Sequence, residues 1–317
     1  MLRKGTFIPM KTKIQDMTSG SPGRLVILFA IPLMLGNICQ QLYTMVDTMV
    51  VGQIAGVEAL AALGAVDFLM WVVTGISTGL TQGFSIQLSQ YYGAKDFENL
   101  RKSLAHSYRL TAFIAVGVLI LSQSFASLVL TGLHTPSNII GMSLLYLRII
   151  FCGIPATAAY NMFASALRAM GNSKTPLTAM IIASVLNVSL DLLFVAGFGW
   201  GVAGAAIATV IAQSFSAVYC FLILRRIDIV HLTRADFMPA SGMNARLMKL
   251  GIPVVFQNII IGVGGLVVQY VINGYGFLFC GRIYSYKQAL WSAGNGCYFL
   301  WICHRYLCGS ESGSRKD

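Results

Sequence analysis

Long apolar runs recur along this chain and leave few folds open to it. A run of about 20 apolar residues is long enough to cross the roughly 30 Å hydrocarbon layer of a membrane. Such runs occupy residues 25–51, 60–90, 105–130, 138–165, 177–198, 202–224 and 247–272. Only 10% of the residues are charged, against roughly 25% in a soluble domain. Because backbone polar groups in lipid must pair within their own segment, we expect each run to be a helix. The sequence predicts an all-α integral membrane protein.

Lys and Arg lie in alternate connections between these runs. They precede the first run and follow the second, fourth and sixth, whereas the connections after the first, third and fifth runs hold none. Positively charged loops stay on the cytoplasmic side. We therefore expect a multi-pass protein of the cell membrane with a cytoplasmic N-terminus. The net charge of +11 then reflects topology and the bilayer as partner. It does not indicate a nucleic-acid partner, because the basic residues form no clustered face.

An aspartate interrupts the first apolar run. Asp47 stands in the stretch TMVDTMV, and Tyr43, Gln40 and Asn37 precede it by 4, 7 and 10 residues. These steps fall close to one face of a helix. An ionisable group inside a span costs about 2.5–3.5 kcal/mol and usually faces a cavity or a partner on an ion or substrate path. A polar clamp between helices is the alternative, but such a clamp can be built without an ionisable group. We expect Asn37, Gln40 and Tyr43 to line a substrate cavity and Asp47 to couple a cation or proton.

A second acidic site is predicted in the fifth run, which reads NVSLD. Asn187 and Asp191 are four residues apart and so share a helix face, and Thr209 adds a hydroxyl in the sixth run. Oxygen ligands of this kind suit a hard cation such as Na⁺. Desolvation also favours the neutral form of a carboxyl group, so each aspartate is a candidate proton carrier. No cofactor is expected; the sequence leaves Na⁺ and H⁺ open as the coupling ion.

Three stretches resemble the multidrug and toxic compound extrusion (MATE) transporters. They are GSPGRLVILFAIPLMLGNICQQLYTMVDTMVVGQIAG, SQYYGAKD, and ALRAMGNSKTP followed by LNVSLD. The resemblance covers most of residues 18–279. It implies twelve helices in two six-helix bundles that expel organic cations and other amphipathic compounds in exchange for Na⁺ or H⁺. It also implies that Asp47 is the acid of the first helix, and that Asn187, Asp191 and Thr209 form the cation site of the first bundle.

A weak internal repeat supports a second bundle. Ile31-Pro32 has a counterpart in Ile252-Pro253, and Asn37 in Asn258, at the same offset of 221 residues. Asp47 aligns with Val268, so the second copy lacks the acid. Transporters are often built from such related halves. The predicted division is a cytoplasmic segment 1–23, a first bundle 24–226, a cytoplasmic linker 227–246, the start of the second bundle 247–279, and a tail 280–317.

The tail departs in composition from the rest of the chain. Four of the seven cysteines lie within residues 280–317. Cys297, Cys303, His304 and Cys308 do not have the compact spacing of a zinc site. With permitted codons, reading residues 282–303 one base later gives a sequence that resembles an eighth MATE helix. We therefore expect a shifted reading frame near residue 280, from a sequencing error or a lesion in the gene, which leaves the second bundle truncated.

These features predict a cation-coupled antiporter that exports drugs or other small, cationic organic compounds, here as a truncated chain with little or no transport. A lipid-linked oligosaccharide flippase of the same superfamily would share the helical plan, although its cavity should be more basic. A channel or receptor would not require the half-repeat or the two spaced acids. A nonfunctional gene remnant is a third alternative. No catalytic constellation is visible, so we do not expect an enzyme.

Overall fold

The computed structural model describes residues 22–238, 242–276 and 278–284, with only the backbone described at 22–28. The described chain is helical: α1 (Pro22–Val50), α2 (Val57–Gly93), α3 (Phe97–Gly132), α4 (Ile140–Cys152), α5 (Ile154–Ala169), α6 (Lys174–Asp191), α7 (Gly201–Leu224) and α8 (Met243–Asn273). Two π-helical segments, η1 (Val51–Ala55) and η2 (Leu192–Gly197), continue α1 and α6, and two short 3₁₀ segments, η3 (Asp228–Val230) and η4 (Arg234–Phe237), lie between α7 and α8. Most of the predicted tail, from residue 285, and its Cys297, Cys303, His304 and Cys308 lie outside the described residues.

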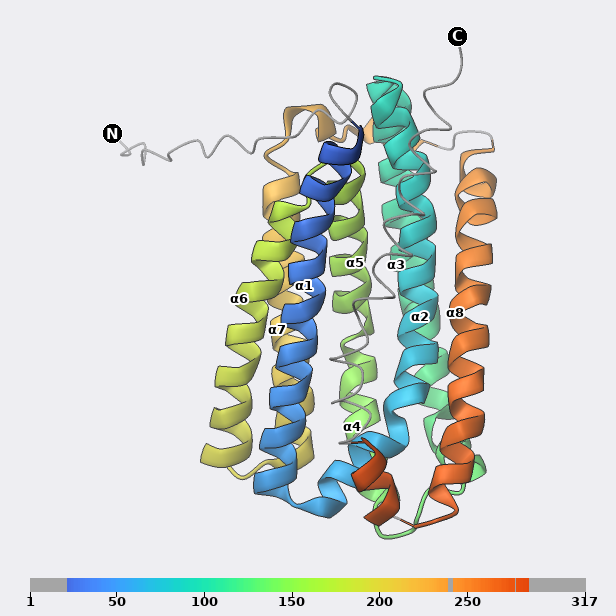
Figure 1. The fold of residues 1–317 in the computed structure, drawn as a ribbon. Coiled ribbons are helices and arrows are strands. Elements are labelled where there is room, and N and C mark those ends of the chain that lie inside the picture. Colours follow the sequence, from blue (N-terminus) through green and yellow to red (C-terminus); the bar gives the residue numbers. More distant parts are fainter. Residues whose placement is uncertain (1–21, 239–241, 277, 285–317) are drawn as a thin grey trace, which may run out of the picture.

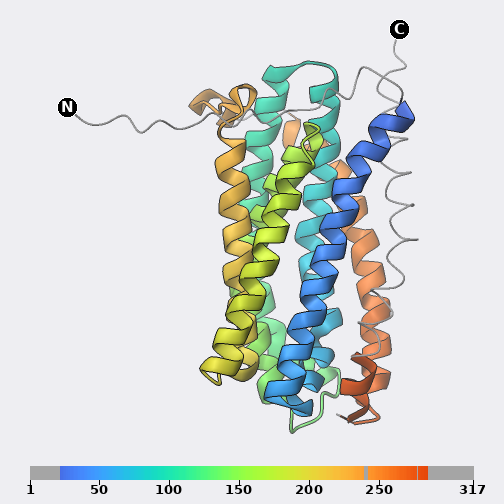
Figure 2. The ribbon, with the colours of Figure 1, turned by 60° about the vertical axis from the view of Figure 1, so that its left-hand side comes forward.

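The long helices form an antiparallel bundle. Successive spans run in opposite directions, so the α2–α3 turn, the α5–α6 turn and the linker after α7 share one end with the start of α1 (Figure 1). Helices α1, α6 and α7 pack side by side, and α2 packs with α3, α5 and α8. In the turned view α7, α6 and α1 stand in a row, with α6 between the other two (Figure 2).

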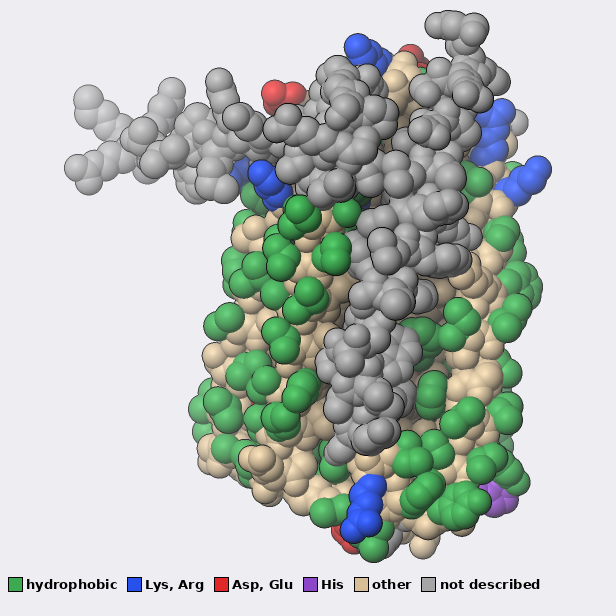
Figure 3. Space-filling view, in the orientation of Figure 1, with side chains coloured by type: hydrophobic (Ala, Val, Ile, Leu, Met, Phe, Trp, Pro, Cys, Tyr) green, Lys and Arg blue, Asp and Glu red, His purple; other side chains and the backbone are tan. Residues whose placement is uncertain are grey.

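The helices have the length and composition of membrane spans. Among the described residues, five helices are long and apolar enough to cross a membrane, and the bent pair α4 and α5 makes a sixth. Helix α1 is not among these six, although its 29 residues extend over about 44 Å at 1.5 Å per residue. Hydrophobic side chains are spread over both sides of the visible face between its two ends, and most visible Lys and Arg side chains lie at the upper end (Figure 3). The chain is a multi-pass, all-helical membrane protein.

The fourth predicted span is broken where one continuous helix was expected. Helix α4 ends at Cys152, α5 begins at Ile154, and the two are bent by 47°. Pro155 stands in the first turn of α5, where the missing N–H of proline costs no helical hydrogen bond. A Cβ atom on Gly153 would lie 2.6 Å from a methyl carbon of Val210. The glycine thus lets α7 approach closely at the bend.

Helix α8 packs along α2 through a row of glycines. Gly75, Gly79 and Gly83 are spaced by four residues, which brings them to one face of α2. A Cβ atom on Gly83 would lie 2.3 Å from the Cα of Gly251, and the Asn258 side-chain amide donates a 3.0 Å hydrogen bond to the Gly75 carbonyl. Small residues at this spacing allow membrane helices to approach backbone to backbone. We call this contact the α2–α8 seam.

The linker between α7 and α8 is folded onto α3. The two ring nitrogens of buried His106 lie 2.7 Å from Asn244 Oδ1 and 3.1 Å from the Met238 carbonyl oxygen. Arg109 donates a 2.9 Å hydrogen bond to the Phe237 carbonyl. These contacts hold the start of α8 against the first six spans.

Candidate functional site

Each of the two predicted membrane acids stands close before a π-helical segment. Asp47 lies in the last turn of α1, before η1, and Asp191 is the last residue of α6, before η2. The two π segments contact each other. A π turn widens the helix and is frequent at functional sites. The contact between the two segments brings the end of α1 close to the end of α6.

The two carboxylates are buried together. Asp47 is 7% exposed and Asp191 is 0% exposed, and the charge of Asp47 acts on Asp191. None of the ion pairs formed by the described residues involves either of them. If both were ionised and nothing were bound, two uncompensated negative charges would stand in the protein interior, which is costly.

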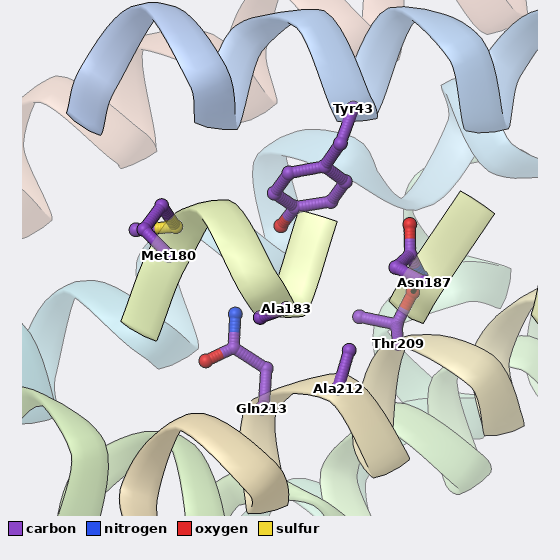
Figure 4. Close-up of a pocket in the computed structure, with 7 residues that line it drawn as sticks. All are labelled: Tyr43, Met180, Ala183, Asn187, Thr209, Ala212 and Gln213. Carbon is purple, nitrogen blue, oxygen red and sulfur yellow. Dashed lines mark hydrogen bonds between the residues drawn. The ribbon is translucent and has the colours of Figure 1, made fainter. Parts of the chain in front are cut away.

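A small cavity lies between α1, α6 and α7. It is lined by Tyr43, Met180, Ala183, Asn187, Thr209, Ala212 and Gln213 (Figure 4). The Asn187 amide donates to the Thr209 hydroxyl at 3.4 Å, and the Tyr43 ring reaches down from α1 into the space between the other two helices. The cavity has room for about one water molecule. It fits an ion or a water and is far too small for an organic drug.

Several buried oxygens around this cavity have no hydrogen-bond partner among the described residues. They are Asp47 Oδ1, Asn187 Oδ1, both carboxylate oxygens of Asp191, and Gln213 Oε1. A buried acceptor left unpaired costs about 1–3 kcal/mol, so native proteins rarely keep several of them together. All five are acceptors, which is the arrangement that protons or a cation would satisfy.

The donor set suits a monovalent ion better than a transition metal. No group of three or more His, Cys, Asp or Glu side chains gathers anywhere in the described ranges. The site offers two carboxylates, with neutral amide and hydroxyl oxygens beside them. Hard cations take oxygen ligands of these kinds.

The structure brings most of the predicted site residues together. Asn187 and Thr209 are bonded, Tyr43 lines the same cavity, and Asp47 and Asp191 interact beside it. Gln40 is half-buried and interacts with Tyr43. Asn37 is different, because it lies exposed on α1 and does not line the cavity.

Two further polar residues reach the site without having been predicted. Gln213 lines the cavity and is four residues after Thr209, so the helical spacing already indicates that both share a face. Tyr146 of α4 is buried and interacts with Asp47 and Tyr43. No local pattern singles out Tyr146, since its place depends on how α4 packs.

Comparisons with known proteins agree with this architecture. The MatE family model matches residues 32–193. The probable multidrug resistance protein YpnP of Bacillus subtilis (strain 168) is 31% identical over 264 residues, which cover 83% of this chain and 59% of that protein. The chain thus spans about three fifths of the length of this curated relative.

Solved structures show the same fold over part of their length. The outward-facing conformation of a multidrug resistance MATE family transporter of the MOP superfamily superposes with a TM-score of 0.75 at 23% identity, covering 93% of this chain and 70% of that one. An inward-facing conformation of such a transporter gives 0.72 at 22% identity, covering 80% and 60%. With the family model matching just over half of the residues, the chain belongs to the MATE family of multidrug efflux transporters.

Proposed function

We propose that this chain is the cation-coupling half of an antiporter that exports small organic compounds. Asp47, Asn187, Asp191 and Thr209 hold the coupling ion, Na⁺ or H⁺. The observation that carries the proposal is the group of five unpaired buried oxygens around one cavity between α1, α6 and α7. A transporter with a coupling-ion site needs such a group, whereas a helix clamp would satisfy its own acceptors.

The coupling follows from differential affinity. A bound cation or proton neutralises the carboxylates and so favours the arrangement of α1 and α6 in which they lie close together. Releasing it restores their repulsion and favours another arrangement. An exporter works when ion and substrate prefer different facing states of the same protein, and each then lowers the affinity for the other.

The substrate binds elsewhere, because the ion cavity holds about one water molecule. We place it between the first bundle and the second half of the carrier, where transporters built from related halves bind their cargo. Asn37 is exposed on α1, so it is available to that larger cavity, with Gln40 one turn further along.

The orientation and the division of the chain complete the proposal. The ends of the bundle differ in charge, and most Lys and Arg side chains visible on one face gather near the start of α1 (Figure 3). This supports a cytoplasmic N-terminus, with residues 1–23 and the linker 227–246 on the cytoplasmic side. Residues 24–226 form the first bundle and 247–279 start the second, and 280–317 are read out of frame.

The test is Asp47→Asn in a version extended to the full two-bundle length. The variant keeps the shape of the side chain but removes the ionisable group. We expect export of a fluorescent organic cation to fall to background while membrane insertion is unchanged. Asp228→Asn is the matched control, because Asp228 is fully exposed in the linker. Export by Asp47→Asn at the wild-type rate would show that Asp47 is not a coupling residue.

A further inference from the structure

Gln213 occupies the side of the ion cavity that faces the N-terminal end of the bundle. It lies one turn beyond Thr209 on α7, and its amide projects into the cavity from the helix opposite Tyr43 (Figure 4). Tyr43 and Gln213 interact, so side chains of α1 and α7 meet at this side of the cavity.

Gln213 Oε1 differs from the carboxylate oxygens because it does not itself take up a proton. A proton bound to Asp47 or Asp191 satisfies that carboxyl group and gives it one donor for a neighbour. Gln213 Oε1 is a neutral acceptor on a different helix, and it is buried without a partner among the described residues. An amide oxygen is not a proton carrier, but it is a good ligand for a hard cation.

Uncharged oxygen ligands also keep the net charge of the site low when a monovalent ion is bound. One Na⁺ compensates a single carboxylate, so the remaining ligands are best uncharged or protonated. Asn187, Thr209 and Gln213 supply uncharged oxygens from two helices that line one cavity.

We propose that Gln213 is a specificity-determining residue that makes this site accept Na⁺, binding the ion directly or through the one water that the cavity can hold. The inference rests on the proposed cation site. It predicts that Na⁺ binding depends on Gln213, whereas proton binding depends on Asp47 and Asp191 alone.

The experiment measures equilibrium binding of radioactive sodium to the full 317-residue chain in detergent, across pH. The variant is Gln213→Met, which keeps the length of the side chain and removes its oxygen. We expect the Kd for Na⁺ to rise about tenfold or more, as for the loss of a hydrogen-bond-like contact to a charge, with the pH midpoint of proton uptake unchanged. Ser214→Ala is the control on the same helix, because within the described ranges the Ser214 hydroxyl bonds its own helix, at the Val210 carbonyl.

The outcomes separate the two proposals. Wild-type Na⁺ affinity in Gln213→Met overturns the role of Gln213 and leaves the cation site standing. A wild-type chain that binds protons through Asp47 and Asp191 but no Na⁺ also overturns it, and leaves proton coupling. A chain that binds neither ion overturns the proposed function itself. If Gln213→Met does not fold, Gln213→Glu serves instead, and its expected signature is Na⁺ binding that gains a new pH dependence.

Discussion

Asp191 is the residue at which stability and function are most clearly opposed. It is completely buried, and both of its carboxylate oxygens are unpaired within the described part of the chain. A side chain kept for packing alone would not be an aspartate here, because leucine or asparagine would fill the place at lower cost. Burying this carboxylate without a partner destabilises the ion-free chain, and a bound cation would offset that cost.

Replacing Asp191 by Asn should therefore stabilise the ion-free chain. The amide removes a buried charge and can donate to neighbouring unpaired oxygens, which we expect to contribute about 1 kcal/mol, or about 2–4 °C in apparent melting temperature. Thermal unfolding of both chains in sodium-free buffer measures this rise in melting temperature.

Thermal unfolding with added Na⁺ tests whether the ion binds at Asp191. Na⁺ should raise the melting temperature of the wild type by mass action and leave Asp191→Asn unchanged. A lower melting temperature for the variant in sodium-free buffer would contradict this account of Asp191.

At the scale of elements, the α2–α8 seam joins the first bundle to the helix that follows it. The two helices run antiparallel, and the close contacts pair Gly83 with Gly251, Gly79 with Val255 and Gly75 with Asn258. Without a hydrophobic driving force between helices in lipid, such close packing is a main source of association. The seam should therefore be sensitive to any added side-chain volume.

We expect Gly83→Leu to destabilise the seam. Its side chain would have to displace the backbone of α8, and overpacking of this kind costs about 1–3 kcal/mol. The apparent melting temperature should fall by several degrees, and trypsin should cut more readily near the exposed Arg246 at the start of α8.

Gly117→Leu on α3 is the matched control, because a Cβ atom there meets nothing within 4 Å. Equal losses in the two variants would mean that the cost lies in the helix itself and not in the seam.

The sequence predicts the elements better than it predicts their irregularities. The apolar runs locate the helices to within about four residues at each end, because exclusion from water acts on any long apolar segment. The exception is the start of α3, at Phe97, where the apolar run begins only at residue 105. The glycine spacing at Gly75, Gly79 and Gly83 would also have indicated the seam. The bend at Gly153 and the π turns after Asp47 and Asp191 could not be found this way, since they depend on how neighbouring helices pack. For the site, helical spacing is enough to group Asn187 with Asp191, and it would have added Gln213, but it cannot bring separate helices together.

At the scale of the whole molecule, the linker makes the start of α8 part of the first bundle. Asp236 accepts hydrogen bonds from the Thr233 backbone at 2.7 Å and hydroxyl at 2.8 Å, which folds η4 into a compact turn. His106 and Arg109 of α3 then hold the residues after it. The residues around Met238 and the start of α8 are thus both anchored to α3 at this end of the bundle.

Removing the His106 contacts should make the linker more accessible to proteases. In His106→Ala the Met238 carbonyl and the Asn244 side chain lose their shared partner, so the linker should open more often. We expect trypsin to cut after Arg234, which is exposed, several-fold faster, as for the loss of about 1 kcal/mol of local stability.

His231→Ala is the control, because His231 is an exposed residue of the same linker. An unchanged rate of cutting in His106→Ala would show that packing alone holds the linker in place.

The α2–α8 seam has a consequence for biosynthesis. Chains emerge from the ribosome N-terminus first, at about 5–20 residues per second, and segments fold in the order in which they appear. Helix α8 therefore leaves the ribosome after its glycine-lined partner on α2 is already in the membrane. Helix α2 thus acts as the template on which α8 packs, so a substitution at Gly79 or Gly83 would impair the docking of a helix synthesised long after it.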